Sequence, residues 1–218
     1  KHYGMEFFQY LGLDSEKLRF HDHEKLAHYA KEACDIEYLF PFGWGEINGT
    51  HNRTDFDLGR HQQYSGKSME YFDDVTNEKY IPYIIESTYG VDRLFLAVLF
   101  ENLHQEDIGE KDTRIVLNIK PALAPIKVNV LPLLKKKHGD MAKDIYKKLT
   151  KYMMVNYDET GSIGKRYRRG DAIGIPFAIT IDDNTIENGV VTVRDRDTME
   201  QQEISVEKLT QFLLDMVE

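Results

Sequence analysis

The sequence predicts an α/β (α+β) protein built from two parts, and three observations support this prediction. Short segments rich in β-branched and aromatic residues, such as 79–86 and 126–130, alternate with helical apolar stripes. A polar, proline-punctuated segment over residues 105–124 is the expected linker. Charge is also unevenly divided: residues 1–110 hold 10 Lys and Arg against 21 Asp and Glu, whereas residues 111–218 hold 18 against 16. We therefore expect two units with different partners.

In the first part, helical and strand patterns follow one another. Apolar residues at helical spacing predict a short helix within residues 23–34. Residues 40–57 are rich in aromatics, Gly and Thr, which is typical of strands joined by turns. Residues 79–86 predict a further strand, and an apolar stripe over residues 91–103 predicts a helix directly after Gly90.

In the second part, the pattern predicts a mixed sheet with helices on its faces, of roughly 95 residues, a normal size for a domain. The expected elements are a strand over 126–130, an amphipathic helix over 141–153, a further strand, a short basic helix, strands over 175–181 and 189–193 joined by a turn near 182–184, and a helix over 206–216.

Composition excludes some classes of protein. No apolar run approaches the roughly 20 residues of a membrane span, so no membrane partner is expected. Cys34 is the single cysteine and cannot form an internal disulfide, which favours a reducing compartment and predicts a cytoplasmic location. The net charge of −9 argues against a general nucleic-acid-binding protein.

One dense basic cluster stands out in the acidic chain. It consists of Lys165, Arg166, Arg168 and Arg169, with Tyr167 between them. Basic residues interleaved with an aromatic are typical of phosphate and base contacts. The alternative is that this cluster is only the solvated start of a helix. The RNA-binding surface would then lie elsewhere, for instance around Arg194 and Arg196.

Two other groups of residues could carry chemistry. His21, Asp22, His23 and His28 are possible zinc ligands, but positions 21 and 23 are not expected to converge, and a polar helix cap is the alternative. Cys34 falls in the expected helical stripe without a His partner at a defined spacing, so it is not expected to be a nucleophile.

The junction between the predicted strand and helix at residues 86–93 is more informative. Glu86 ends the strand and can receive an ammonium group, while the helix N-terminus and Arg93 offer donors to an anion. A small zwitterion beside a polyphosphate would suit both ends. A simple Glu–Arg pair at a helix start is the alternative.

This junction, Glu-Ser-Thr-Tyr-Gly-Val-Asp-Arg, resembles motif 3 of class II aminoacyl-tRNA synthetases. Other parts of the chain resemble the glycyl-tRNA synthetases more specifically. These segments are residues 18–30, 43–46, 52–58, 161–169 and 193–199.

The resemblance implies two domains: the carboxy-terminal part of a class II antiparallel-sheet catalytic domain in residues 1–112, and a mixed-sheet anticodon-binding domain in residues 113–218. It implies a ligase that uses ATP and Mg²⁺ to activate glycine to glycyl-adenylate, then transfers the glycyl group to tRNA(Gly) in protein synthesis. A homodimer is implied for the complete enzyme. Such catalysis relies on positioning and charge stabilisation, so no catalytic nucleophile is expected.

The resemblance also assigns roles to residues. Glycine would be bound by Glu86, Ser87, Thr88, Tyr89 and Gly90. ATP would be bound by Glu46, Ile47, Gly90, Val91, Asp92 and Arg93, with Glu46 also the Mg²⁺ ligand. tRNA would be bound by Lys165, Arg166, Arg168 and Arg169. The family more often has Pro-Ser where this chain has Ser87-Thr88, so the hydroxyl is kept and a methyl group is added.

Segments resembling motifs 1 and 2 are not found, and in the family both precede the region matched here. The chain is therefore expected to be a carboxy-terminal fragment that does not make glycyl-adenylate by itself at an appreciable rate. A non-catalytic tRNA-binding accessory protein is the alternative. Retention of Glu46, Glu86 and Arg93 favours the enzyme.

Overall fold

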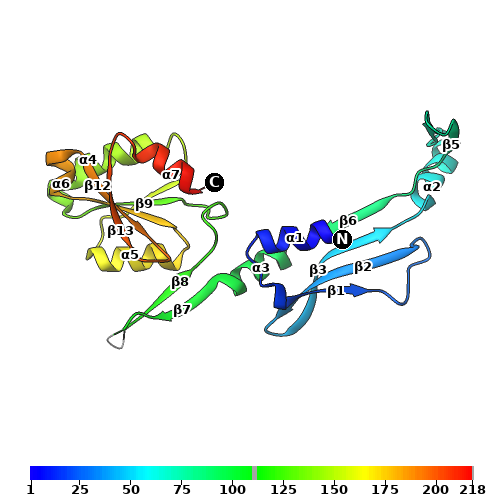
Figure 1. Ribbon diagram of the computed structural model, residues 1–218, viewed down its shortest axis with the longest axis horizontal. Helices are drawn as coiled ribbons and strands as arrows, with labels where there is room; N and C mark the ends of the chain where they lie inside the picture. The colour runs from blue at the N-terminus through cyan, green and yellow to red at the C-terminus, as the bar shows by residue number, and fades with distance from the viewer. Residues whose placement is uncertain (110–111, 218) are drawn as a thin grey trace. The chain divides into compact units, whose positions relative to one another are not determined.

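The computed structural model describes residues 1–109 and 112–217, and the chain divides into two compact units, 1–101 and 102–218 (Figure 1). Each unit has its own main sheet, with four strands in the first and five in the second. The predicted mixed α/β fold is confirmed, with an antiparallel sheet in one unit and a mixed sheet in the other.

The sheet of the first unit is antiparallel throughout. Its strand order is β1 (Leu18–Asp22), β2 (Glu32–Phe40), β3 (Gly43–Asn52) and β6 (Ile85–Tyr89). Helix α1 (His2–Tyr10) packs on one face, which carries Ile36 and Tyr89. The approach is close, because a Cβ on Gly4 would lie only 2.9 Å from Cδ1 of Ile36. The opposite face is not covered by α1.

The remaining elements of the first unit are a short 3₁₀ helix at Ser15–Lys17, α2 (Phe56–Ser65), the hairpin of β4 (Tyr71–Asp73) and β5 (Glu78–Tyr80), and α3 (Val91–Asn102). The helix predicted after Gly90 is confirmed. The helix predicted over 23–34 is wrong, because residues 23–31 are not helical and β2 begins at Glu32. Along β2 the apolar residues Cys34, Ile36, Tyr38 and Phe40 are buried at alternate positions. The strand predicted over 79–86 is divided between β5 and β6.

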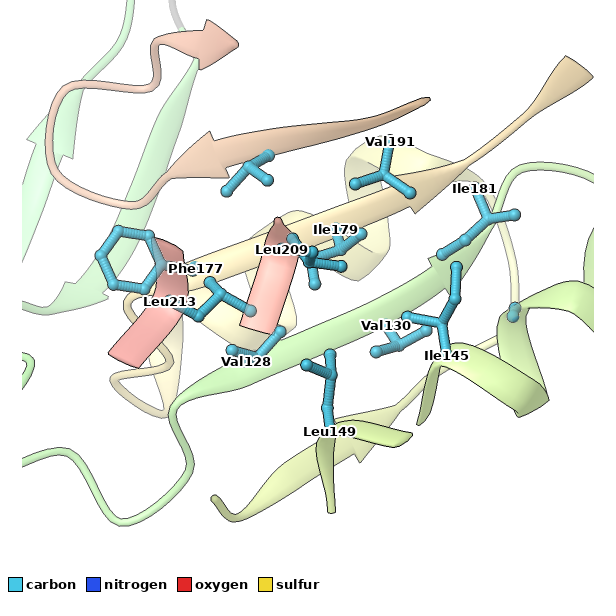
Figure 2. Close-up of a cluster of buried hydrophobic side chains, with 12 residues drawn as sticks. Val128, Val130, Ile145, Leu149, Phe177, Ile179, Ile181, Val191, Leu209 and Leu213 are labelled. Carbon is cyan, nitrogen blue, oxygen red and sulfur yellow. The ribbon is translucent and has the colours of Figure 1, made fainter. Parts of the chain in front are cut away.

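The second unit is built on a five-stranded sheet. Its order is β10 (Val155–Tyr157), β9 (Val128–Pro132), β11 (Phe177–Ile181), β12 (Val190–Asp195) and β13 (Gln201–Ser205), and the first three strands are parallel. On one face α4 (Lys135–Leu149) and α7 (Leu209–Val217) enclose the hydrophobic core (Figure 2). Val130, Ile179 and Leu213 are completely buried there.

Helix α5 (Ile163–Ala172) packs on the opposite face of this sheet. The hydroxyl groups of Tyr167 and Thr180 share a hydrogen bond of 2.6 Å, and a Cβ on Gly170 would lie 3.2 Å from Nδ2 of Asn129. The predicted basic helix is thereby confirmed. The sequence pattern did not predict β13, and the predicted turn near 182–184 is instead the start of helix α6 (Asp183–Asn188).

The predicted linker contains a hairpin. β7 (Leu103–Asp107) pairs with β8 (Thr113–Leu117), and both strands belong to the second unit. The functional boundary after residue 112 stays a prediction. No helix in the described part of the chain is long and apolar enough to cross a membrane.

Candidate functional site

The sheet face that α1 leaves uncovered in the first unit is polar. In neighbouring antiparallel strands, directly opposed residues share a face and successive residues alternate. Asp35 of β2 is opposite Gly49 of β3, and Gly49 is opposite Thr88 of β6. The next row along places His51 opposite Glu86. Two of the predicted glycine-binding side chains, those of Glu86 and Thr88, therefore lie on this open face.

Glu86 is held by a partner that the sequence interpretation missed. Its Oε2 accepts a hydrogen bond of 2.7 Å from Nη1 of Arg53, and Nδ1 of His51 lies 3.9 Å away. Arg53 also donates to both carboxylate oxygens of Asp57, at 2.6 and 3.1 Å, and stacks 4.1 Å above the ring of Tyr29. Hydrogen bonds to Asp57 and Glu86 raise the pKa of Arg53. The spacing of Arg53 and Asp57, one helical turn apart, is the signal that could have indicated the pair.

Ser87 and Tyr89 point to the α1 face. The Oγ of Ser87 accepts a hydrogen bond of 3.1 Å from the buried amide of Asn48, and Tyr89 makes an edge contact with Phe8 at 6.0 Å. The same Asn48 amide donates to the Thr88 carbonyl at 2.6 Å. These contacts fix β6 against β3. The side chains of Ser87 and Tyr89 thus do not converge with those of Glu86 and Thr88.

The predicted ATP-binding residues meet where α3 begins. The N–H of Gly90 donates to the Ile47 carbonyl at 3.1 Å, and Nη1 of Arg93 donates to the Glu46 carbonyl at 2.9 Å. Ile47 is completely buried, so only its backbone could face a ligand. Val91, Asp92 and Arg93 form the exposed first turn of α3. The free N–H groups of a helix start favour anions, as the sequence interpretation required.

The Glu46 carboxylate is exposed on the same face. Among the described residues, no group of three or more His, Cys, Asp or Glu side chains could hold a metal ion. Mg²⁺ needs only one or two carboxylates when substrate phosphates complete its coordination. Glu46 therefore fits Mg²⁺ bound together with a nucleotide, and not an all-protein metal site.

The histidine cluster differs from the prediction. The rings of His21 and His23 stack 5.3 Å apart at 10°, because residues two apart in extended backbone point to the same side, so the prediction that they would not converge is wrong. His21 lies 3.0 Å from a Glu37 oxygen and His23 lies 2.7 Å from an Asp35 oxygen. Partial burial opposes ionisation of Glu37, but hydrogen bonds from His21 and Arg19 lower its pKa overall.

In the second unit, the basic cluster on α5 divides into two kinds of side chain. Arg166 is only 4% exposed, and its Nη1 donates to the Pro132 carbonyl at 2.7 Å. Lys165, Arg168 and Arg169 are exposed. Arg168 pairs with Asp112, and Arg169 donates to Asp158 at 2.6 Å. Arg166 thus ties α5 to the loop after β9, while the other three present charge to solvent.

Arg194 and Arg196 belong to the interior. Arg194 donates to both carboxylate oxygens of the buried Asp171, at 2.9 and 3.1 Å, and Arg196 is 1% exposed. Arg114 of β8 donates to the same Asp171 at 3.1 Å. The alternative RNA surface around Arg194 and Arg196 is therefore wrong, because neither guanidinium faces solvent.

Comparison with known proteins shows which family and which proteins this chain is similar to. Residues 124–216 match the family described as anticodon binding domain. The chain is 52% identical over 204 residues to the glycine–tRNA ligase of Chlorobaculum tepidum, covering 93% of this chain and 43% of that protein. It is 54% identical over 205 residues to the glycine–tRNA ligase of Alkaliphilus oremlandii, covering 93% and 44%. For the Clostridium acetobutylicum glycine–tRNA ligase the identity is 50% over 215 residues, covering 98% and 46%.

The chain thus spans less than half the length of these relatives. The matches nevertheless extend over both units, since they cover more than nine-tenths of the chain. Together, these matches confirm that the chain resembles the glycyl-tRNA synthetases over nearly its whole length, and that residues 124–216 match the anticodon binding domain family.

Proposed function

We propose that this chain supplies the motif 3 region and the anticodon-binding domain of a glycine–tRNA ligase, which activates glycine with ATP and transfers it to tRNA(Gly). The observation that supports this most directly is the junction of β3, β6 and α3. There Glu86 and Thr88 share one open face, and Arg93 is bonded to the Glu46 carbonyl at 2.9 Å. A homodimer and a cytoplasmic location belong to the same proposal. The homodimer rests on the resemblance alone, and the cytoplasmic location rests on the single cysteine, Cys34.

In this proposal, Glu86 and Thr88 bind the amino end of glycine. The bond from Arg53 fixes the orientation of the Glu86 carboxylate, and no described residue donates to its other oxygen, Oε1. Oε1 is therefore available to the ammonium group of glycine. The forked pair of Arg53 with Asp57 limits the movement of Arg53, so the carboxylate is preorganised and need not reorient when substrate binds.

The nucleotide phosphates would lie at the start of α3. The N–H groups of its first turn and the forked guanidinium of Arg93 are donors suited to phosphate oxygens. Glu46 would hold Mg²⁺ against those oxygens, and the ion would neutralise the charge that develops on them. The protein's part in activation is then to align the glycine carboxylate with the α-phosphate, without a nucleophile of its own.

The exposed side of α5 would bind RNA in the second unit. Lys165, Arg168 and Arg169 supply positive charge, and we exclude Arg166 from this surface because its guanidinium is engaged by buried carbonyls. Arg168 and Arg169 are balanced by Asp112 and Asp158 in the structure. Phosphate binding would replace these exposed ion pairs, which contribute little stability on their own.

The Glu86→Gln change tests the glycine site, in the protein at its full natural length. It keeps the shape of the side chain but removes the charge, and we expect a loss of roughly 2–4 kcal/mol in transition-state stabilisation. Glycine-dependent exchange of pyrophosphate into ATP measures this, with Glu78→Gln on the exposed β5 as the matched control. Unchanged glycine kinetics would remove Glu86 from the site.

Residues 1–218 alone are predicted not to support this exchange at an appreciable rate, and the same assay tests that prediction. If the protein at its full natural length also lacks exchange yet binds tRNA, the non-catalytic accessory protein is the better interpretation.

The double change Arg168→Ala and Arg169→Ala tests the RNA surface. We expect weaker tRNA binding and a salt dependence that flattens by about one to two units of slope, one for each lost phosphate contact. The measurement is tRNA affinity at several salt concentrations. The matched control is Lys147→Ala with Lys151→Ala, which removes the same charge near the end of α4. Equal slopes and affinities for wild type and the Arg168 and Arg169 variant would show that these two residues form only a solvated helix face.

A further inference from the structure

The open face of the first unit has a gap at Gly49. Asp35, Gly49 and Thr88 form one cross-strand row over β2, β3 and β6, and the middle position has no side chain. The backbone does not require glycine here, because the φ angle of Gly49 lies outside the left-handed region that favours glycine. What limits the side chain at this position is instead the space above the Cα, where three side-chain oxygens lie within 3.4 Å of a Cβ.

Three oxygen atoms face that space from three strands. A Cβ on Gly49 would lie 3.3 Å from Oδ1 of Asp35, 3.3 Å from Oε1 of Glu46 and 3.4 Å from Oγ1 of Thr88. We call this arrangement the Gly49 notch, formed by Asp35, Glu46, Gly49 and Thr88. The backbone of Gly49 lies at the base of the notch, and the oxygens around it are hydrogen-bond acceptors. A small donor group therefore suits its size and chemistry.

The charge of the notch points to a cation. Asp35 is 7% exposed, and its other oxygen, Oδ2, lies 2.7 Å from Nε2 of His23. No Lys or Arg in the described part of the chain forms an ion pair with Asp35 or with the Glu46 carboxylate. Glu86, by contrast, already has Arg53 as its partner at 2.7 Å. Two carboxylates directed at one small space are stabilised by a cation that binds between them.

We propose that the Gly49 notch receives the α-ammonium group of the amino-acid substrate, with Asp35 and Thr88 as direct acceptors and Gly49 as the residue that leaves room for it. This inference rests on the proposed function and adds Asp35 and Gly49 to the glycine site. An ammonium group has three N–H donors, and Asp35, Thr88 and the neighbouring Glu86 can each accept one. The Glu46 carboxylate adds negative charge beside the notch, and in the proposed function it also holds Mg²⁺ at the nucleotide.

Two substitutions test the notch, each with a matched control. Gly49→Ala places a methyl group among the three oxygens, whereas Gly59→Ala adds one on α2 where nothing lies within 4 Å. Asp35→Asn removes the buried charge, whereas Asp74→Asn removes an exposed one in the β4–β5 turn. The assay is glycine-dependent pyrophosphate exchange by the protein at its full natural length. The Michaelis constants for glycine and ATP are measured separately, and thermal melting checks folding.

We expect Asp35→Asn to raise KM for glycine at least about 10-fold, as for a lost hydrogen bond to a charged group. Gly49→Ala should raise it by a similar factor, because the methyl group takes the space of the ammonium group. KM for ATP should change less than about twofold in both variants. Both controls should match the wild type. Unchanged KM for glycine in folded Gly49→Ala would overturn the inference. An equal rise of KM for glycine and for ATP would also overturn it, because that result assigns the notch to the nucleotide.

Failure of the proposed function can be told apart from failure of the notch. If the wild type shows no exchange, calorimetric titration with glycine decides between them. If the wild type binds glycine and Asp35→Asn abolishes this binding, the notch proposal stands and only the proposed ligase activity is refuted. Absence of glycine binding in the wild type overturns both.

Discussion

Replacing Asp171 by Asn should destabilise the second unit strongly. This carboxylate is 3% exposed and accepts hydrogen bonds from Arg194 at 2.9 and 3.1 Å and from Arg114 at 3.1 Å. Both arginines are buried as well. The substitution keeps the size of the side chain but leaves two buried guanidinium groups facing a neutral amide. Breaking a buried pair in this way costs about 3–5 kcal/mol.

Not every contact of the network is lost in Asp171→Asn. Arg114 keeps its ion pair with Glu106 and its bond to the Arg196 carbonyl at 2.7 Å, so most of the loss should fall on Arg194. Asp112→Asn is the matched control. Asp112 pairs with Arg168, which lies on α5 like Asp171, but both side chains of this pair are about half exposed. The control should cost much less, because an exposed ion pair contributes little to stability.

Differential scanning calorimetry and hydrogen exchange measure the two effects. We expect the melting transition of the second unit to fall by roughly 10–20 °C in Asp171→Asn and by only a few degrees in the control. Exchange should accelerate in β8, which Arg114 anchors, and in α5, which carries Asp171. Equal losses in the two variants, or a loss below about 1 kcal/mol in Asp171→Asn, would refute the argument that burial makes this network important.

Two further predictions concern pH. Burial and the hydrogen bond to Glu101 at 2.5 Å raise the pKa of Tyr38 well above its ordinary value, so its contribution to stability is complete below about pH 10 and is lost as the pH rises above that. Tyr38→Phe should therefore cost about 1–2 kcal/mol at neutral pH and less at about pH 10.5, in urea unfolding followed by the fluorescence of Trp44. The hydrogen bond from Arg168 lowers the pKa of Asp112, so this pair stabilises the fold above the ordinary Asp pKa and is lost as the pH falls through the lowered value. Carboxyl NMR titration should show the Asp112 pKa rising in Arg168→Ala, and an unchanged value would mean that the pair does not form in solution.

Local patterns predicted part of the fold well. The apolar repeat of Met141, Ile145 and Leu149 lies on α4, whose buried face the structure confirms, and the alternation at residues 126–130 marks the approach to β9. The same approach failed at residues 23–34, where helical spacing over a short window competed with the alternation that begins at Cys34 and continues along β2. Alternation extended over the longer segment, and tertiary packing of that strand against its neighbours decided the outcome.

The candidate site shows a different limit. Glu86 and Arg93 could be found from the sequence because they lie within one short segment around the β6–α3 turn. Arg53 and Asp35 could not be assigned in this way. Arg53 reaches Glu86 from the end of β3, and Asp35 faces Gly49 from β2, so both relationships depend on strand register. Register is fixed by the whole sheet, and a shift of one residue would send each of these side chains to the α1 face.

Helix α5 shows how far residue type alone can mislead and how geometry corrects it. Arg166 and Arg169 are three positions apart, yet one is engaged by buried carbonyls and the other faces solvent. A helix turns about 100° per residue, so Arg166 shares its inward face with Gly170, one turn later. Gly170 has to be small there, because a Cβ would approach the Asn129 amide at 3.2 Å. Lys165, Arg168 and Arg169 follow the same periodicity on the other side, with spacings of three and four. Helical phase, which the tight approach of Gly170 to the sheet fixes, therefore separates the structural arginine from those proposed to contact RNA.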